Sequence, residues 1–344
     1  GNWMNYSDPK IGEQFFIMKL QEMLPGFDRK NRTQRDKIPL ADVIFPYVRF
    51  NHPEFNRILN WFKNQTITGT TKGIFEGIHC TVRGFQFDFG TGGIHGSIES
   101  SIVESDEDYI IEDWDVASYY PNIGIKNKIY PQHLGEVFCE IYEGIYQQRK
   151  QYPKGTAENA MLKLALNAAF GKSNSIYSCF YDPQYTMTIT INGQLMLCML
   201  AEALMAADDV QMIQINTDGL SIRYPRWMQT WVHEVCAWWE QITALDLESA
   251  EYKRMFIRDV NSYLAEYQDG KIKRKGAYDY DLGWHQNHSA LIVPKAAEAA
   301  LLHGQDIRSF IEDHSDPYDY MLRTKVPRSS RLVGVNYRGN DIPF

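Results

Sequence analysis

The strongest constraint in this chain is the segment Ile213–Ile222, IQINTDGLSI, which predicts a β-hairpin with an acidic residue at its turn. Apolar and polar residues alternate on both sides of the turn, and Asn216 to Gly219 have the chemistry of a tight reversal. Such a turn would hold the Asp218 carboxylate in a fixed place, as a magnesium ligand requires. An acid in a hairpin turn is more often simply solvated, so this segment alone indicates a site only weakly.

A second carboxylate strengthens the prediction. In Tyr109–Pro121, β-forming residues lead into Asp115, and Pro121 is expected to stop the turn that follows. Asp115 is therefore predicted at the end of a strand. Two strand-end aspartates that are distant in sequence can converge in a sheet and hold two metal ions for an in-line phosphoryl displacement.

Between the two aspartates, the segment from Thr156 to Gly171 predicts a helix with Thr156 as its N-cap and Gly171 as its stop. Lys163, Asn167 and Phe170 fall at i, i+4 and i+7 and share one face. An ordinary surface helix explains the lysine and asparagine equally well, but it explains the aromatic ring poorly. That ring suits stacking on a base pair while Lys163 meets phosphate.

These segments together resemble a known family. Asp115–Pro121, DVASYYP, resembles motif A of the family B DNA polymerases, and Lys163–Gly171 resembles their motif B. Asn216-Thr217-Asp218 resembles the Asp-Thr-Asp of motif C. Two further segments fit the family: Gly90–Gly96 is similar to the Tyr-x-Gly-Gly loop before the palm, and Lys273–Tyr278 to the Lys-x-Tyr region. The resemblance runs from about residue 85 to 335, with the general character of a bacteriophage enzyme.

The resemblance implies roles for individual residues. Asp115 and Asp218, with the Val116 carbonyl, would hold two Mg²⁺ ions, for which Mn²⁺ is the expected substitute. Lys163 would also serve catalysis. Residues implied to bind the incoming dNTP are Ser118, Tyr119, Tyr120, Arg149, Lys163, Asn167 and Phe170. Those implied to contact primer and template are Gly92, Gly93, Thr217, Lys273, Lys275 and Tyr278.

Two of these assignments carry more detail. Tyr120 would lie under the deoxyribose and exclude a 2′-hydroxyl group, so the chain is expected to prefer dNTPs over rNTPs. Arg149 belongs to a segment, Gln147–Lys154, that offers three cations, and the sequence does not decide which of them point inward.

The sequence also departs from the family pattern. Asn216 replaces the first aspartate of motif C, and Gly219 replaces the serine that usually follows it. Ala168 and Phe170 replace the serine and tyrosine of motif B. In the family the second aspartate of motif C is the principal metal ligand, and Asp218 keeps it, so activity is expected to survive. The departures are expected to affect nucleotide selectivity and fidelity more than the reaction itself.

The resemblance implies an α+β, right-hand polymerase fold with an antiparallel-sheet palm, two-helix fingers and a short helical thumb. Its expected divisions are a connecting region at 1–100, palm at 101–134 and 176–285, fingers at 135–175 and a thumb, complete or incomplete, at 286–344. Asp8 resembles the end of the last exonuclease motif, but its partner carboxylates are missing, so no 3′–5′ exonuclease activity is expected. The alternative is that Asp8 caps the helix after it.

Composition is compatible with this interpretation. The net charge of −8 is unusual for a DNA-binding protein, but cations cluster at 29–37, 149–154, 271–275 and 325–338. The longest apolar run, Leu195 to Ala207, is too short for a membrane span and predicts a core helix at 194–207, and four tryptophans between 227 and 239 are expected in the core. Five cysteines without C-x-x-C spacing indicate reduced thiols and a cytoplasmic protein.

The function expected from the sequence is DNA-directed DNA synthesis, with primer-template DNA and dNTPs as partners and no membrane. A separate exonuclease chain or a processivity factor is a candidate protein partner. Two alternatives stay open: a primer-template-binding module of a split polymerase, catalytically impaired by Asn216, and a metal-dependent nuclease that uses the same carboxylates. The helix with Lys163 and Asn167 argues against the nuclease, which has no use for it.

Overall fold

The computed structural model describes residues 5–70, 73–283, 286–331, 333–336 and 338–343. The chain forms two compact units. The first contains residues 1–260 and 265–272, and the second contains 261–264 and 273–344. The fold is mixed α+β with a large antiparallel sheet, as the sequence predicts at this coarse level.

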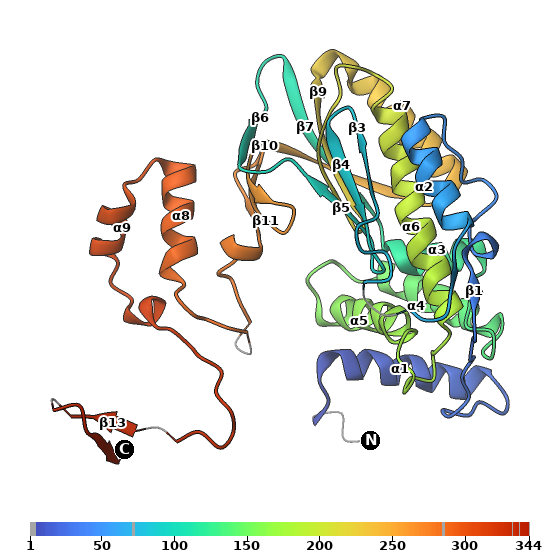
Figure 1. Cartoon of the computed structure of the whole chain (residues 1–344), viewed down its shortest axis with the longest axis horizontal. Coiled ribbons are helices and arrows are strands. Elements are labelled where there is room, and N and C mark those ends of the chain that lie inside the picture. Colours follow the sequence, from blue (N-terminus) through green and yellow to red (C-terminus); the bar gives the residue numbers. More distant parts are fainter. Residues whose placement is uncertain (1–4, 71–72, 284–285, 332, 337, 344) are drawn as a thin grey trace. The chain divides into compact units, whose positions relative to one another are not determined.

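The sheet of the first unit brings together strands from distant parts of the sequence (Figure 1). Its strand order is β10-β7-β9-β8-β5-β4-β3, and β6 also pairs with β10. The bounds are β3 His79–Val82, β4 Phe85–Phe89, β5 Ile94–Ser97, β6 Ser101–Glu104, β7 Tyr109–Val116, β8 Gln211–Asn216, β9 Gly219–Pro225 and β10 Leu247–Asp259. The chain passes between the two units along β11, Ser262–Tyr267, and β12, Ile272–Lys275.

Helices fill the rest of the first unit. They are α1 Asp8–Met23, α2 Pro53–Lys63, α3 Tyr119–Asn127, α4 Val137–Lys150, α5 Ala157–Lys172, α6 Pro183–Leu204 and α7 Gln229–Thr243. Short pieces are β1 Ile38–Pro39, β2 Thr66–Ile67, η2 Leu40–Asp42 and η3 Arg226–Met228. In Figure 1, α6 and α7 lie along the sheet, and α1, α4 and α5 form a separate helical layer.

The second unit is smaller. It contains the end of β12, η4 Gly276–Tyr278, α8 Ile292–His303, α9 Ile307–Asp313, η5 Pro317–Tyr320 and the pair β13 Val333–Val335 and β14 Asp341–Pro343. Ion pairs hold it together internally: Arg274 makes a two-pronged contact with Glu298 at 2.5 and 2.6 Å, and Lys295 pairs with Asp319 at 2.6 Å.

The central helix α6 is longer than the sequence indicates. We predicted a helix at 194–207, but it runs from Pro183 to Leu204, because Asp182 caps its start through Gln184 N and the first turns are buried as well. By length and composition α6 could cross a membrane, yet 89% of its most apolar window is buried inside the protein. It is the core helix of this unit.

Several local predictions need correction. Helix α5 continues through Gly171 to Lys172, and Pro121 lies in the first turn of α3 instead of stopping it, since proline is tolerated there. Ser7, not Asp8, occupies the N-cap position of α1. Of the four tryptophans, only Trp239 is fully buried, where its indole nitrogen donates to the Met196 carbonyl, whereas Trp227 is 76% exposed.

The acidic segment before Asp115 is less solvated than its charge suggests. Glu112 and Asp113 of β7 are both buried, because each is satisfied by hydroxyl groups from neighbouring strands. Tyr224 donates to Glu112, and Asp113 accepts from Ser221 and, at 2.6 Å, from Tyr252. These bonds fix β7, whose last residues are Asp115 and Val116.

Helix α1 packs directly on α5 at a glycine. A Cβ added to Gly12 would lie 2.5 Å from the carbonyl carbon of Leu164 and 2.7 Å from the amide nitrogen of Ala165. Backbone atoms cannot yield as a side chain can, so the two helices can approach this closely only with glycine at position 12.

Gly12→Ala is therefore expected to lower the free energy of unfolding by about 1–3 kcal/mol, measured by urea denaturation. The matched control is Gly144→Ala in α4, where a new Cβ meets nothing within 4 Å. That substitution should stabilise the protein by about 0.5–1 kcal/mol through helix propensity alone. Equal effects of the two substitutions would contradict this account of the α1–α5 contact.

Candidate active site

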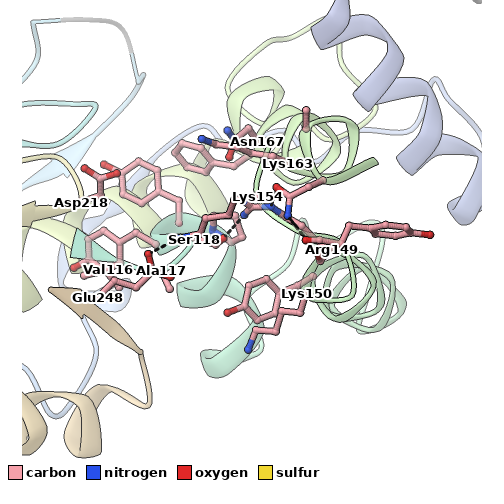
Figure 2. A pocket seen from close by; sticks show the side chains of 18 of the residues that line it. Val116, Ala117, Ser118, Arg149, Lys150, Lys154, Lys163, Asn167, Asp218 and Glu248 are labelled. Atoms are coloured by element: carbon pink, nitrogen blue, oxygen red, sulfur yellow. Dashed lines mark hydrogen bonds and ion pairs between the residues drawn. The ribbon is translucent and has the colours of Figure 1, made fainter. Parts of the chain in front are cut away.

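A pocket of about 850 Å³ opens between the end of the sheet and the helices α4 and α5 (Figure 2). Asp218, Val116 and Glu248 lie on its sheet side, and Lys163, Asn167 and Arg149 lie on its helical side. The sheet side is acidic and the helical side is basic, so the pocket suits a ligand that carries negative charge together with a cation.

The acidic side is assembled by strand register. In the antiparallel pairing of β7 with β9, Asp115 lies opposite Gly219, which directly follows Asp218. In the pairing of β7 with β10, Asp115 lies opposite Glu248. Residues directly opposed in such a ladder have their Cβ atoms about 5 Å apart. Asp115 and Glu248 therefore lie at the same end of the sheet as the turn that carries Asp218, and all three carboxylates are exposed.

The predicted hairpin is confirmed, and its turn is bound to the strand end beside it. The loop between β8 and β9 consists of Thr217 and Asp218, with Asn216 paired to Gly219. The amide of Val116 donates to the Asp218 carbonyl at 2.7 Å. This bond fixes the two aspartate-bearing segments relative to each other without using either carboxylate.

Asn216 stabilises the turn. Its Oδ1 atom accepts from the amide of Thr217 at 2.8 Å and from the Thr217 hydroxyl at 3.4 Å. The family pattern has an aspartate at this position, and an aspartate could accept the same bonds. The departure therefore changes the charge next to Asp218 while leaving the turn intact.

Gly219 also has a local explanation. A Cβ at this position would collide with the side-chain oxygen of Asp115 and with the carbonyl of Trp114. In this structure the Asp115 carboxylate thus occupies the space that the family's usual serine would need.

The segment after β7 is anchored to the helical side. Ser118 adopts a left-handed backbone conformation, with φ of 47° and ψ of 53°. Its hydroxyl accepts from Arg149 at 2.8 Å, and the same guanidinium donates to Asn159 at 3.3 Å. The question that the sequence left open is resolved for Arg149, which points inward and is held from two sides.

Helix α5 presents the predicted face to the pocket. Thr156 is the N-cap, as predicted, and accepts from Asn159 N at 3.3 Å. Lys163 and Asn167 are exposed at the pocket wall (Figure 2), and Phe170, which is half-buried, also lines the pocket. The helical spacing read from the sequence thus places all three side chains in one pocket.

The two tyrosines of the motif A segment differ in their surroundings. Tyr119 is buried and donates to the Gly193 carbonyl at 2.6 Å, so it supports the pocket from beneath. Tyr120 lies at the pocket wall with its ring 4.6 Å from that of Phe170, centroid to centroid. Burial raises the pKa of the Tyr120 hydroxyl above its ordinary value, so the group is a neutral donor.

Gly92 and Gly93 lie next to these residues, in the loop between β4 and β5. The Tyr120 hydroxyl donates to the Gly92 carbonyl at 2.5 Å, and Gly93 approaches Thr217 of the hairpin turn. The loop is closed by a bond from Gly90 N to Gly93 O at 3.1 Å. The structure therefore brings the predicted glycine loop to the aspartate turn and to Tyr120.

Lys154 and Glu248 are among the pocket residues that the sequence analysis did not single out. Lys154, from the loop before α5, pairs with Glu248 of β10 at 2.8 Å across the pocket (Figure 2). Both side chains are more than half exposed, so this ion pair contributes little stability and can be exchanged for other partners. Cross-strand register alone identifies Glu248, because no sequence motif surrounds it.

The remaining predicted residues belong to the second unit. Lys273 and Lys275 lie in β12, and Tyr278 ends the short helix η4. Lys275 is exposed, and the Lys273 ammonium group lies 5.9 Å from the centroid of the Tyr263 ring. Their contact with a primer strand stays a prediction.

The four cation clusters have different surroundings. In the first, Arg35 forms an ion pair with the buried Asp182 at 3.1 Å, so it supports the fold. In the last, Lys325, Arg328 and Arg331 are all exposed. The second cluster supplies Arg149, Lys150 and Lys154 to the pocket.

The donor set fits a hard divalent cation. Among the residues that the structure describes, no group of three or more His, Cys, Asp or Glu side chains is close enough to hold a metal ion by itself. Mg²⁺ ordinarily takes only one or two protein carboxylates and completes its shell with water and substrate phosphates. Asp115, Asp218 and the Val116 carbonyl offer oxygen ligands of this kind.

Comparison with known proteins gives a distant likeness only. No protein-family model matches the chain, and no curated protein matches its sequence. Among solved structures, the chain is similar to the family B DNA polymerase from the hyperthermophilic archaeon Pyrobaculum calidifontis, with a TM-score of 0.47 and 14% identity. The match covers 89% of this chain and 37% of that one.

The structural role of Asn216 can be tested by stability. Asn216→Ala removes both hydrogen bonds of the turn and is expected to lower the free energy of unfolding by about 0.5–1.5 kcal/mol. Asn216→Asp keeps the acceptor and should cost less than half as much. Chemical denaturation of the two variants measures the difference, and an equal loss in both would show that the turn does not depend on this acceptor.

Proposed function

We propose that this chain is a DNA-directed DNA polymerase of the family B type, which adds dNTPs to a primer 3′ end on a template. The observation that carries the proposal is the pocket that Asp218 shares with Lys163, Asn167 and Arg149, with Asp115 at the adjoining strand position opposite Gly219. Three segments that resemble family B motifs, distant in sequence, supply Asp115, Asp218, Lys163 and Asn167, and α4 adds Arg149. A nuclease would need the carboxylates but not the cationic helix face.

Different pocket residues would bind the triphosphate, the sugar and the base of a dNTP. Lys163 and Arg149 would neutralise the triphosphate, and Arg149 is already oriented by Ser118 and Asn159. Tyr120 would lie against the sugar, and Phe170 would offer its ring to the base pair. Such prior orientation favours catalysis, because little reorganisation is needed when charge develops on the phosphates.

Asp115, Asp218 and the Val116 carbonyl would hold the metal ions. Mg²⁺ ions, when bound, would activate the primer 3′-hydroxyl group as nucleophile and stabilise the pyrophosphate leaving group. The chain's own part is to fix these oxygens at one sheet end and to place the cations of α4 and α5 across from them. The sheet would then be the palm and the α4–α5 pair the fingers.

We assign DNA binding to the cations despite the overall negative charge. The net charge of −8 opposes DNA, so the contacts must be local. The second unit, which would correspond to a thumb, contributes Lys275, Lys325, Arg328 and Arg331, all exposed. Primer-template affinity should fall steeply with salt, since each phosphate contact releases counterions.

One observation favours a second candidate, the catalytically impaired primer-template-binding module. Asn216 has an amide where the family has a carboxylate, and its side-chain oxygen accepts a hydrogen bond from the Thr217 amide within the turn. If the first aspartate of motif C were required for metal binding, the chain would bind DNA without extending it. Primer extension and DNA binding, measured side by side, separate the two functions.

Template-directed extension of a labelled primer, with four dNTPs and Mg²⁺, tests the proposal. Asp115→Ala and Asp218→Ala should each lower the extension rate by at least about 100-fold, because a metal ligand is lost, with DNA affinity largely kept. Asp209→Ala is the matched control, as Asp209 is exposed before β8, at the other end of that strand from Asp218. Near-native extension by either active-site variant would refute the assignment, and no extension by folded, DNA-binding wild type would favour the binding module.

Tyr120 provides a test of sugar selection. Tyr120→Ala opens the space beneath the sugar, so the preference for dNTPs over rNTPs should fall by about 10- to 100-fold, since the steric barrier is removed. Single-nucleotide incorporation of a dNTP and the matching rNTP, compared as kcat/KM, measures it. An unchanged preference would place the discriminating contact elsewhere in the pocket.

A further inference from the structure

The Tyr120 side chain is enclosed before any nucleotide arrives. Its hydroxyl donates to the Gly92 carbonyl at 2.5 Å, and its ring lies beside Phe170. On the side of α6, a Cβ at Gly193 would come within 3.1 Å of the Tyr120 Cε1 atom, so the helix backbone also borders the ring. The ring position is therefore set by its neighbours and does not depend on the ligand.

Gly93 is the tightest of these neighbours. A Cβ added there would lie 3.0 Å from the Tyr120 hydroxyl oxygen, 3.0 Å from Thr217 Cγ2 and 3.1 Å from Thr217 Oγ1. One methyl group at position 93 would thus press on Tyr120 and on the turn that carries Asp218. The adjacent Gly92 differs, because a Cβ on that residue meets nothing within 4 Å.

We propose that Gly93 is a positioning residue for sugar selection: by having no side chain, it lets the Tyr120 hydroxyl reach the Gly92 carbonyl and so fixes the ring against the sugar of an incoming nucleotide. This inference rests on the proposed polymerase function and deepens it. The inference needs no contact of Gly93 with the incoming nucleotide or with the metal, because the residue acts through the space that it leaves for the Tyr120 side chain.

The test compares three variants by the ratio of kcat/KM for a dNTP to that for the matching rNTP. Gly93→Ala should lower this ratio by about 10-fold or more, as expected when a pocket contact is displaced. Gly84→Ala adds the same methyl group at another glycine of positive φ, 80° compared with 157° at Gly93, in open space between β3 and β4, and should keep the ratio. In a Tyr120→Phe background, Gly93→Ala should lower the ratio much less, because the hydroxyl that the methyl group meets is absent.

Each contrary result has a distinct meaning. An unchanged or higher ratio in Gly93→Ala overturns the inference, and so does an equal fall in Gly84→Ala, which would indicate a general effect of backbone strain at a glycine of positive φ. An equally large fall in the Tyr120→Phe background would show that Gly93 does not act through the hydroxyl.

Failure of the proposed function is recognised separately. Equilibrium binding of a dNTP and an rNTP, with Mg²⁺ and primer-template, gives the same ratio without requiring extension. If the wild-type chain binds a dNTP more tightly than the rNTP but extends no primer, the proposed polymerase function is refuted. The effect of Gly93→Ala on the ratio of the two binding affinities then still decides the inference. A wild-type chain that shows no preference in either assay would overturn the inference itself.

Discussion

The geometry of the candidate active site depends on the pairing of β7 with its two neighbours. Asp115 lies opposite Gly219 on one side and Glu248 on the other, and the Val116 amide binds the Asp218 carbonyl at 2.7 Å. A shift of β7 by one residue would turn Asp115 to the other face of the sheet. The buried hydroxyl bonds to Glu112 and Asp113 hold this register, because a slip would leave both acids unsatisfied.

The helical side of the pocket depends on contacts of another kind. Arg149 reaches across from α4 to Ser118 and Asn159, and α5 is supported from behind by α1 at Gly12. The close approach of α1 to α5 and the hydrogen bonds of Arg149 thus place Lys163 and Arg149 in the same pocket as the carboxylates of Asp218 and Glu248. The ion pair between Lys154 and Glu248 joins the two sides, and its exposure leaves it open to exchange with a charged ligand.

Glycine recurs where functional segments meet. Gly219 leaves room for the Asp115 carboxylate, and Gly93 leaves room for Tyr120 and Thr217. A Cβ at Gly219 would collide with the Asp115 side chain, and a Cβ at Gly93 would press on Tyr120 and Thr217. The departures from the family pattern at Asn216 and Gly219 therefore have local physical reasons, and they do not by themselves indicate a lost activity.

The sequence by itself determined the local elements: the 213–222 hairpin with Asp218 at its turn, Asp115 at a strand end, and one helix face with Lys163, Asn167 and Phe170. Short-range turn chemistry and periodicity decide such features. Only the tertiary structure placed Glu248 opposite Asp115, turned Arg149 inward, buried Glu112 and extended α6 back to Pro183. Those outcomes depend on strand register and on burial against distant segments, which no local pattern encodes.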